Sequence, residues 1–242
     1  MRDGEKFGYN GMEVTRTKTV FNFPLRYKET KSKVWSGRPL IFTSSLTDVF
    51  HPKIDEFREE MWAIIRKCPH LIFQILTKRI DRVHNLLPKD WGGGYENVWL
   101  GASVENQEWA DERIPILKSI PARLRFLSIE PLLGDIDFTG ESTLLNKRQI
   151  TLGRTLVGRG IDWMIIGGES GNDQGKYGYR PMGLTMAEWC IEMAHKDKIP
   201  VFMKQTGTAF AKAYKLKDRH GRNIDEWPES IRVREFPNEQ YF

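Results

Sequence analysis

Six short apolar segments, each followed by polar residues, constrain the fold of this chain more than any other feature of its sequence. They occupy residues 39–42, 71–76, 98–100, 124–127, 163–166 and 200–203. Strands that are buried on both faces of a sheet read as continuous apolar runs of this kind. In parallel α/β folds, ligands bind at the carboxyl ends of such strands. The pattern therefore predicts that the chain gathers its polar chemistry along one rim.

Helical stretches separate the predicted strands. Helices are expected over residues 52–68, 79–87, 106–119 and 184–197. Strands that alternate with helices imply a parallel sheet with right-handed crossovers. The predicted fold class is α/β: an open or partial parallel (β/α) barrel, TIM-like, of about six strands. A doubly wound open sheet is the alternative.

The ends of two helices carry recognisable signals. Asn106 suits the N-cap of the helix over residues 106–119, and Pro115 is expected to kink or divide that helix. Thr185 and Glu188 have the spacing of a capping box at the start of the last helix. The inward face of that helix is expected to hold Ala187, Cys190, Ile191 and Ala194.

Three segments are expected along the chain. Residues 1–38 form an N-terminal extension, residues 39–206 the (β/α) barrel core, and residues 207–242 a polar C-terminal tail. Within the extension, residues 15–23 are expected to be extended. With the two residues before them, they would partly cover the open sheet edge beside the first strand, because Val20, Phe21 and Phe23 need burial.

Composition narrows the class of protein. The 242 residues are 40% hydrophobic, and 37 basic against 32 acidic side chains give a formal charge of +5. This excess is too small to argue for nucleic acid by itself. The chain has two cysteines, which excludes a disulfide framework or a Cys-x-x-Cys metal site. No apolar stretch is as long as a membrane-spanning helix, which needs about 20 residues. We expect a cytoplasmic protein with no membrane partner and no metal.

Charged residues follow the predicted strands at similar places. If the sheet curls, their side chains converge and would hold a zwitterionic or anionic ligand, or tune one another's pKa values. The alternative is a purely structural ring of ion pairs. The candidate rim residues are Asp48, Lys78, Arg79, Glu105, Glu130, Glu169 and Lys204.

The sequence Gly-Gly-Glu-Ser-Gly at residues 167–171 follows a buried strand. Gly167 and Gly168 would let the backbone approach a ligand closely, and their bare amides would bind an anion. The alternative is a tight turn with no ligand. Arg180 is expected either to fold its guanidinium back toward Glu169 or to lie on the surface.

For the other reactive side chains, a structural role is the simpler interpretation. Cys68 and Cys190 lie on apolar helix stripes and are interpreted as small core residues. His51, close to Asp48, is a candidate ligand or base, but a lone histidine in a loop is more often neither. A basic cluster in the tail is either solvated or in contact with phosphates; it comprises Lys212, Lys215, Lys217, Arg219, His220 and Arg222.

Longer motifs make the chain recognisable over about residues 20–230. They lie at residues 46–51, 73–79, 97–107, 110–115, 126–134, 167–171, 180–182 and 202–205. Together they resemble the phage gene-product thirty-seven/sixty-eight family, a phage and bacterial domain of unknown function. Members of that family look like radical S-adenosylmethionine enzymes, in which cysteines near the N-terminus hold an iron–sulfur cluster.

The resemblance implies an open six-stranded barrel whose rim residues are cofactor and substrate positions. S-adenosylmethionine is the cofactor that it implies. No cysteine precedes Cys68, so this chain alone is expected to hold no iron–sulfur cluster. We expect a truncated or split member, with a separate chain supplying the cysteine-cluster unit, in a bacterial or phage-infected cell. The alternative is a non-catalytic phage binding protein that contacts nucleic acid or protein.

Overall fold

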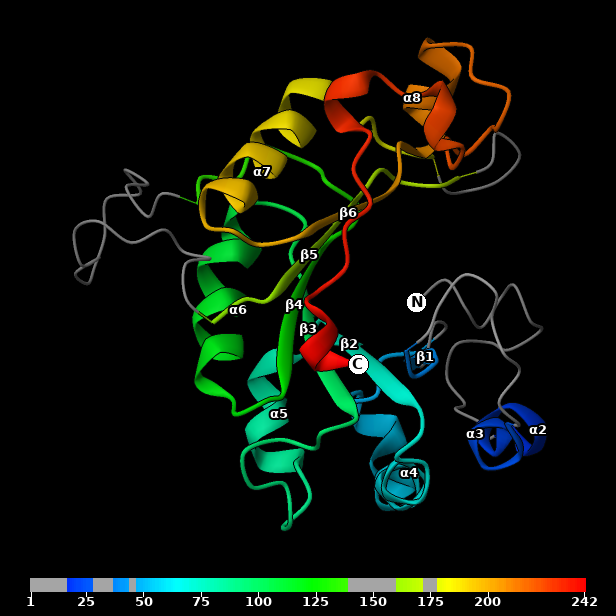
Figure 1. Ribbon diagram of the computed structural model, residues 1–242, viewed down its shortest axis with the longest axis vertical. Helices are drawn as coiled ribbons and strands as arrows, with labels where there is room; N and C mark the ends of the chain where they lie inside the picture. Colours follow the sequence, from blue (N-terminus) through cyan, green and yellow to red (C-terminus); the bar gives the residue numbers. More distant parts are fainter. Residues whose placement is uncertain (1–16, 28–36, 44–46, 139–159, 172–177) are drawn as a thin grey trace. The chain divides into compact units, whose positions relative to one another are not determined.

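The computed structural model of the chain describes residues 17–27, 37–43, 47–138, 160–171 and 178–242 (Figure 1). The strands are β1 (Leu40–Thr43), β2 (Ile72–Thr77), β3 (Val98–Ser103), β4 (Leu124–Ile129), β5 (Trp163–Gly167) and β6 (Val201–Gln205). The helices are α2 (Lys18–Phe21), α3 (Phe23–Arg26), α4 (Asp55–Lys67), α5 (Ile80–Leu86), α6 (Gln107–Ser119), α7 (Leu184–Lys196) and α8 (Gly207–Ala213). Short 3-10 helices are η1 (Pro52–Ile54), η2 (Ile224–Glu226), η3 (Glu229–Ile231) and η4 (Glu239–Tyr241).

The six strands lie in one sheet in the order of the sequence, from β1 to β6. They run parallel, with Leu40 opposite Ile72, Phe126 opposite Trp163, and Met164 opposite Val201. A doubly wound sheet reverses its strand order at a switch point, so this order excludes that alternative. The α/β partial parallel barrel expected from the sequence is confirmed.

Two compact units make up the chain. Unit 1 comprises Met1–Gly101, Ile120–Arg123 and Glu239–Phe242, and unit 2 comprises Ala102–Ser119 and Leu124–Asn238. In unit 1, the buried ring of Trp62 on α4 packs against Trp91 at 5.5 Å between ring centroids. In unit 2, the expected inward stripe of α7 is confirmed, with Ala187, Cys190, Ile191 and Ala194 all buried.

Residues 18–23 do not form the extended segment that the sequence favoured. They lie in α2 and α3, and Pro24 occupies the first turn of α3, where its fixed φ suits a helix. Val20 is 72% exposed and Phe23 is also exposed, so the expected burial of these side chains is wrong. Residues 13–16 lie outside the described residues.

Of the two predicted helix starts, one is confirmed. Asn106 Oδ1 accepts the Trp109 amide at 3.1 Å, as expected of an N-cap of α6. Pro115 does not divide α6, which runs unbroken from residue 107 to 119. The capping box is wrong, because Gly183 is the N-cap of α7 and Thr185 already lies in the first turn. The Glu188 carboxylate instead accepts the Ser230 hydroxyl at 2.5 Å.

The C-terminal segment is polar in composition but folds back onto unit 2. It runs beside β6 (Figure 1), where Met203 N donates to Val233 O at 2.9 Å and Glu235 N donates to Val201 O at 2.7 Å. Trp227 and Ile231 of this segment are buried. This segment is therefore not simply a solvated tail. None of the helices in the described ranges is long and apolar enough to span a membrane.

Candidate functional site

The carboxyl ends of β4, β5 and β6 carry the main polar cluster of unit 2. Glu130 follows β4, and Lys204 and Gln205 are the last two residues of β6. Glu130 Oε2 accepts Lys204 Nζ at 2.9 Å, and Oε1 accepts Gln205 Nε2 at 3.1 Å. Gly167 ends β5, and a Cβ there would lie 3.2 Å from Glu130 Cδ. Gly167 therefore makes room for the Glu130 carboxylate.

The Gln205 side chain joins this cluster to the loop after β5. Its Nε2 also lies 3.1 Å from Gly168 O and 2.6 Å from Ser170 Oγ. An amide nitrogen carries two protons, so three acceptors compete for two hydrogen bonds. The cluster therefore has acceptor capacity that its own amide does not fill.

The Glu169 carboxylate is bonded to Arg180. Its Oε2 accepts Arg180 N at 2.8 Å and Nε at 2.9 Å, and its Oε1 accepts Nη2 at 2.9 Å. The carboxylate is buried, whereas the Arg180 side chain is 58% exposed. These hydrogen bonds raise the pKa of Arg180. Of the two expected placements for Arg180, the structure shows the folded-back one.

The amide of Gly168 is not bare as expected, and that of Gly171 in the same turn is also bonded. Gly168 N donates to Gln205 O at 2.9 Å, and Gly171 N donates to Thr208 Oγ1 at 3.0 Å. A Cβ on Gly168 would lie 2.1 Å from Thr206 O. Gly168 is therefore needed because the chain's own backbone approaches it.

Glu105 after β3 forms a buried pair with Arg113 of α6. The Oε2–Nη1 distance is 3.1 Å, and the same Nη1 donates to Ser103 O at 2.7 Å. The guanidinium stacks on Trp109 at 3.9 Å. Since both members of the pair are buried, this pair fits the structural reading of the rim.

In unit 1, Asp48 joins the loop after β1 to the end of β2. Its carboxylate accepts Phe50 N at 2.9 Å, Thr77 Oγ1 at 2.8 Å, Lys78 N at 2.9 Å and Arg79 Nη1 at 3.1 Å. These four donors fill the acceptor positions of the carboxylate. The Lys78 side chain is exposed, and its amide takes part in this cluster.

His51 has a structural role as the N-cap of η1. Its Nδ1 accepts Lys53 N at 3.1 Å. Burial, and then the charge of Arg79, lower the pKa of this imidazole. The interpretation that His51 is neither ligand nor base agrees with this geometry.

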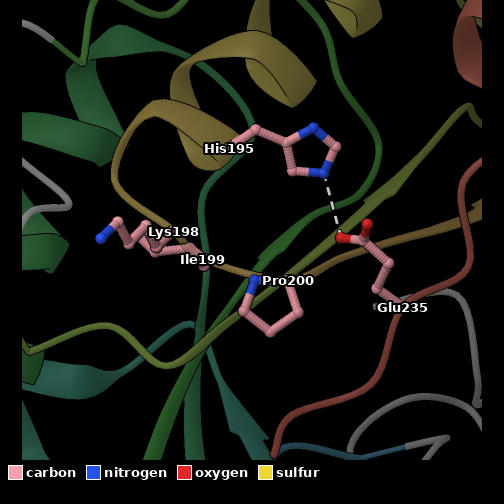
Figure 2. A pocket seen from close by; sticks show the side chains of 5 residues that line it. All are labelled: His195, Lys198, Ile199, Pro200 and Glu235. Atoms are coloured by element: carbon pink, nitrogen blue, oxygen red, sulfur yellow. Dashed lines mark hydrogen bonds and ion pairs between the residues drawn. The ribbon is translucent and has the colours of Figure 1, made fainter.

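A hollow of about 340 Å³ lies just before β6, at its amino end (Figure 2). Its lining residues are His195, Lys198, Ile199, Pro200 and Glu235. His195 Nε2 lies 3.0 Å from Glu235 Oε2, which also accepts Val201 N at 2.9 Å. These bonds hold the C-terminal segment against β6. The hollow contains none of the residues that the sequence singled out for the rim.

The two thiols do not fit an iron–sulfur cluster. Cys68 and Cys190 are both buried, as expected of core residues. Burial raises the pKa of both, that of Cys190 to about 12. Within the described ranges, no three His, Cys, Asp or Glu side chains are grouped as metal ligands would be. A cluster of this type needs three or four thiolates.

The structure thus brings together part of the predicted rim. Glu130, Gly167 and Lys204 meet in one cluster; Glu169 and Arg180 form a pair, and Asp48 and Arg79 another. Sequence reasoning missed Gln205 and Ser170 as site residues, although both lie inside motifs that carried the resemblance. Their place in those motifs is the signal by which they could have been found.

The fold and this cluster define an α/β partial-barrel protein with carboxylate–cation pairs at its strand ends. The chain belongs to the family described as "protein of unknown function (DUF5131)", whose profile matches residues 3–230. Comparison with curated proteins and with solved structures gives no match. The expected membership of a family of unknown function is confirmed. The phage origin and the radical S-adenosylmethionine resemblance stay predictions.

Proposed function

We propose that the cluster of Glu130, Lys204, Gln205 and Ser170 binds the α-amino-acid group of S-adenosylmethionine or a relative of it. One observation carries this proposal. At the strand ends, the Glu130 carboxylate lies 2.9 Å from the ammonium of Lys204, whose side chain is 53% exposed. An α-amino acid carries an ammonium and a carboxylate on one carbon and is complementary to such a pair.

The chain's own hydrogen bonds leave capacity for a ligand. Among the described residues, each Glu130 oxygen accepts one donor, whereas a carboxylate offers about four acceptor positions. A ligand ammonium would bind there. One of the three Lys204 protons goes to Glu130, and the others would bind a ligand carboxylate. The exposed Ser170 hydroxyl is a further donor.

The choice of S-adenosylmethionine as the ligand rests on the family resemblance. The structure limits which residues are available to bind it. Glu169 and Gly168 are occupied by Arg180 and Gln205, so we assign the ligand's ammonium to Glu130. When bound, S-adenosylmethionine supplies an activated carbon next to a sulfonium. The radical chemistry implied by the resemblance needs a cluster that the described thiols do not fit. The proposal therefore covers binding and assigns no step through a cluster.

Calorimetric titration with S-adenosylmethionine, S-adenosylhomocysteine and methionine tests the proposal. We expect the first two to bind, and Glu130→Gln and Lys204→Met each to weaken binding by about ten-fold or more, because each removes a hydrogen bond between charged groups. Glu192→Gln and Lys196→Met, at exposed positions on α7, are matched controls and should bind as the unaltered chain does.

Two results would overturn the proposal. One is no heat of binding with any of the three compounds. The other is unchanged affinity in both Glu130→Gln and Lys204→Met. Thermal unfolding curves of all variants show whether a loss of binding reflects a loss of folded protein.

A further inference from the structure

Tyr214, at the end of α8 in unit 2, presents a flat aromatic face to solvent. Its ring stacks on that of Phe210, one helical turn earlier, with centroids 4.2 Å apart and planes 14° apart. Phe210 is buried, whereas Tyr214 is 55% exposed. One face of the Tyr214 ring is therefore covered and supported, and the rest of the side chain lies open.

The backbone around Tyr214 is firmly fixed. Tyr214 N donates to Phe210 O at 2.9 Å, and Leu216 N donates to Ala211 O at 2.8 Å. Lys215 between them adopts a left-handed conformation, with φ at 53°, as is common where a helix ends. The exposed ring therefore does not depend on a loose loop for its position.

Cations flank this ring in the sequence and are exposed at the surface. Residues 212–222 hold five Lys and Arg residues and one acidic residue, Asp218. The five cations are all exposed: Lys212, Lys215, Lys217, Arg219 and Arg222. Lys212 Nζ also lies 5.0 Å from the ring centroid of a second aromatic residue, Tyr179.

The neighbouring carboxylates are engaged mainly with the backbone, and Asp218 Oδ2 also accepts Arg222 Nε at 3.3 Å. Asp218 Oδ1 accepts His220 N at 2.8 Å, and this bond is the main cause of the lowered pKa of Asp218. Glu226 accepts the amides of Lys217 at 3.1 Å and Asp218 at 3.2 Å. After burial, the charges of Arg219 and Arg222 lower the pKa of His220, which agrees with a positive field there.

We propose that this surface, which we call the α8 platform (Tyr214 with the five cations), binds single-stranded nucleic acid. A base would stack on the open face of Tyr214, and the phosphates beside it would contact the cations. Duplex nucleic acid hides its base faces and would leave the ring unused. An acidic peptide or an anionic membrane would match the charges but not the supported ring. The inference is independent of the rim site.

Fluorescence anisotropy with a labelled fifteen-residue oligothymidine tests the platform. We expect Tyr214→Ala to weaken binding by about ten-fold, and Tyr214→Phe, which keeps the stacking face, to bind nearly as the unaltered chain does. Lys217→Gln should weaken binding and reduce the salt dependence by about one phosphate contact. Lys196→Gln, at an exposed position on α7, is the matched charge control.

Competition decides between the possible partners. We expect unlabelled oligothymidine to displace the probe at lower concentrations than duplex DNA, polyglutamate or phosphatidylserine vesicles. Equal or better displacement by one of those competitors would overturn the proposal, as would absence of binding at 50 mM salt. Equal affinity of Tyr214→Ala and Tyr214→Phe would also overturn it, and their unfolding curves identify any loss of structure.

Discussion

At the scale of single residues, the three carboxylates after β3, β4 and β5 differ in the exposure of the cations that they contact. Arg113 beside Glu105 is buried, whereas Arg180 and Lys204 are largely exposed. Breaking a buried pair leaves an unpaired charge in the interior, whereas an exposed pair contributes little to stability. The exchange of partners with a ligand that we propose for Glu130 and Lys204 therefore costs less than the same exchange would at the buried pair of Glu105 and Arg113.

Gly168 gives a test at this scale. A Cβ at this position would meet Thr206 O at 2.1 Å, and a backbone atom cannot move aside as a flexible side chain can. We expect Gly168→Ala to lower the free energy of unfolding by about 2 kcal/mol, as overpacking does. Urea unfolding measures this change.

Gly134→Ala is the matched control, because no atom lies within 4 Å of the Cβ that it would add. It should change stability by less than about 0.5 kcal/mol. Equal stability of the two variants would contradict the close approach of residues 168 and 206.

At the scale of the elements, α6 shows how packing overrides a local signal. Proline inside a helix costs about 3 kcal/mol, yet α6 continues through Pro115 for four more residues. Ile114 and Leu117 on either side of it are fully buried. The apolar area that they bury offsets the lost backbone hydrogen bond, so the helix does not divide.

The start of α6 gives the second test. Asn106→Ala removes the acceptor for the Trp109 amide and should lower the free energy of unfolding by about 1 kcal/mol. Asn106→Ser keeps a capping oxygen and should retain most of that stability. Urea unfolding of both variants measures the difference, and equal losses would contradict the capping role.

At the scale of the whole molecule, each unit holds one histidine with a lowered pKa. For His51 in unit 1 the causes are burial and then Arg79, and for His220 in unit 2 burial and then Arg219. Below about pH 6.5 the unfolded chain binds protons at these sites more readily than the folded chain. Their contribution to stability is therefore complete above that pH and is lost as the pH falls.

Thermal unfolding by circular dichroism between pH 7.5 and 5.5 measures this loss. We expect the Tm to fall by about 2 °C or more over this range. The double variant His51→Asn with His220→Asn keeps a hydrogen-bond acceptor at each position but removes the titration, so its Tm should change less. An equal fall in the variant would show that other groups cause the pH dependence.

The sequence by itself determined the alternation of strands and helices, the fold class and the burial of Cys68 and Cys190. These features follow from local hydrophobic periodicity, because a residue's neighbours in the sequence report which face is buried. The charged endings of the strands also predicted where Glu130 and Lys204 would lie, since parallel strands share their carboxyl edge.

Only the tertiary structure decided which side chains contact one another along that edge. Gln205 reaches Glu130 across 75 positions of sequence, Gly168 packs against Thr206, and Glu235 pairs with Val201. No local pattern encodes such partners, because they depend on how separate strands and loops are brought together. For the same reason, the sequence could not show that Arg180 holds Glu169, that four donors bond Asp48, and that Glu130 contacts Lys204 and Gln205.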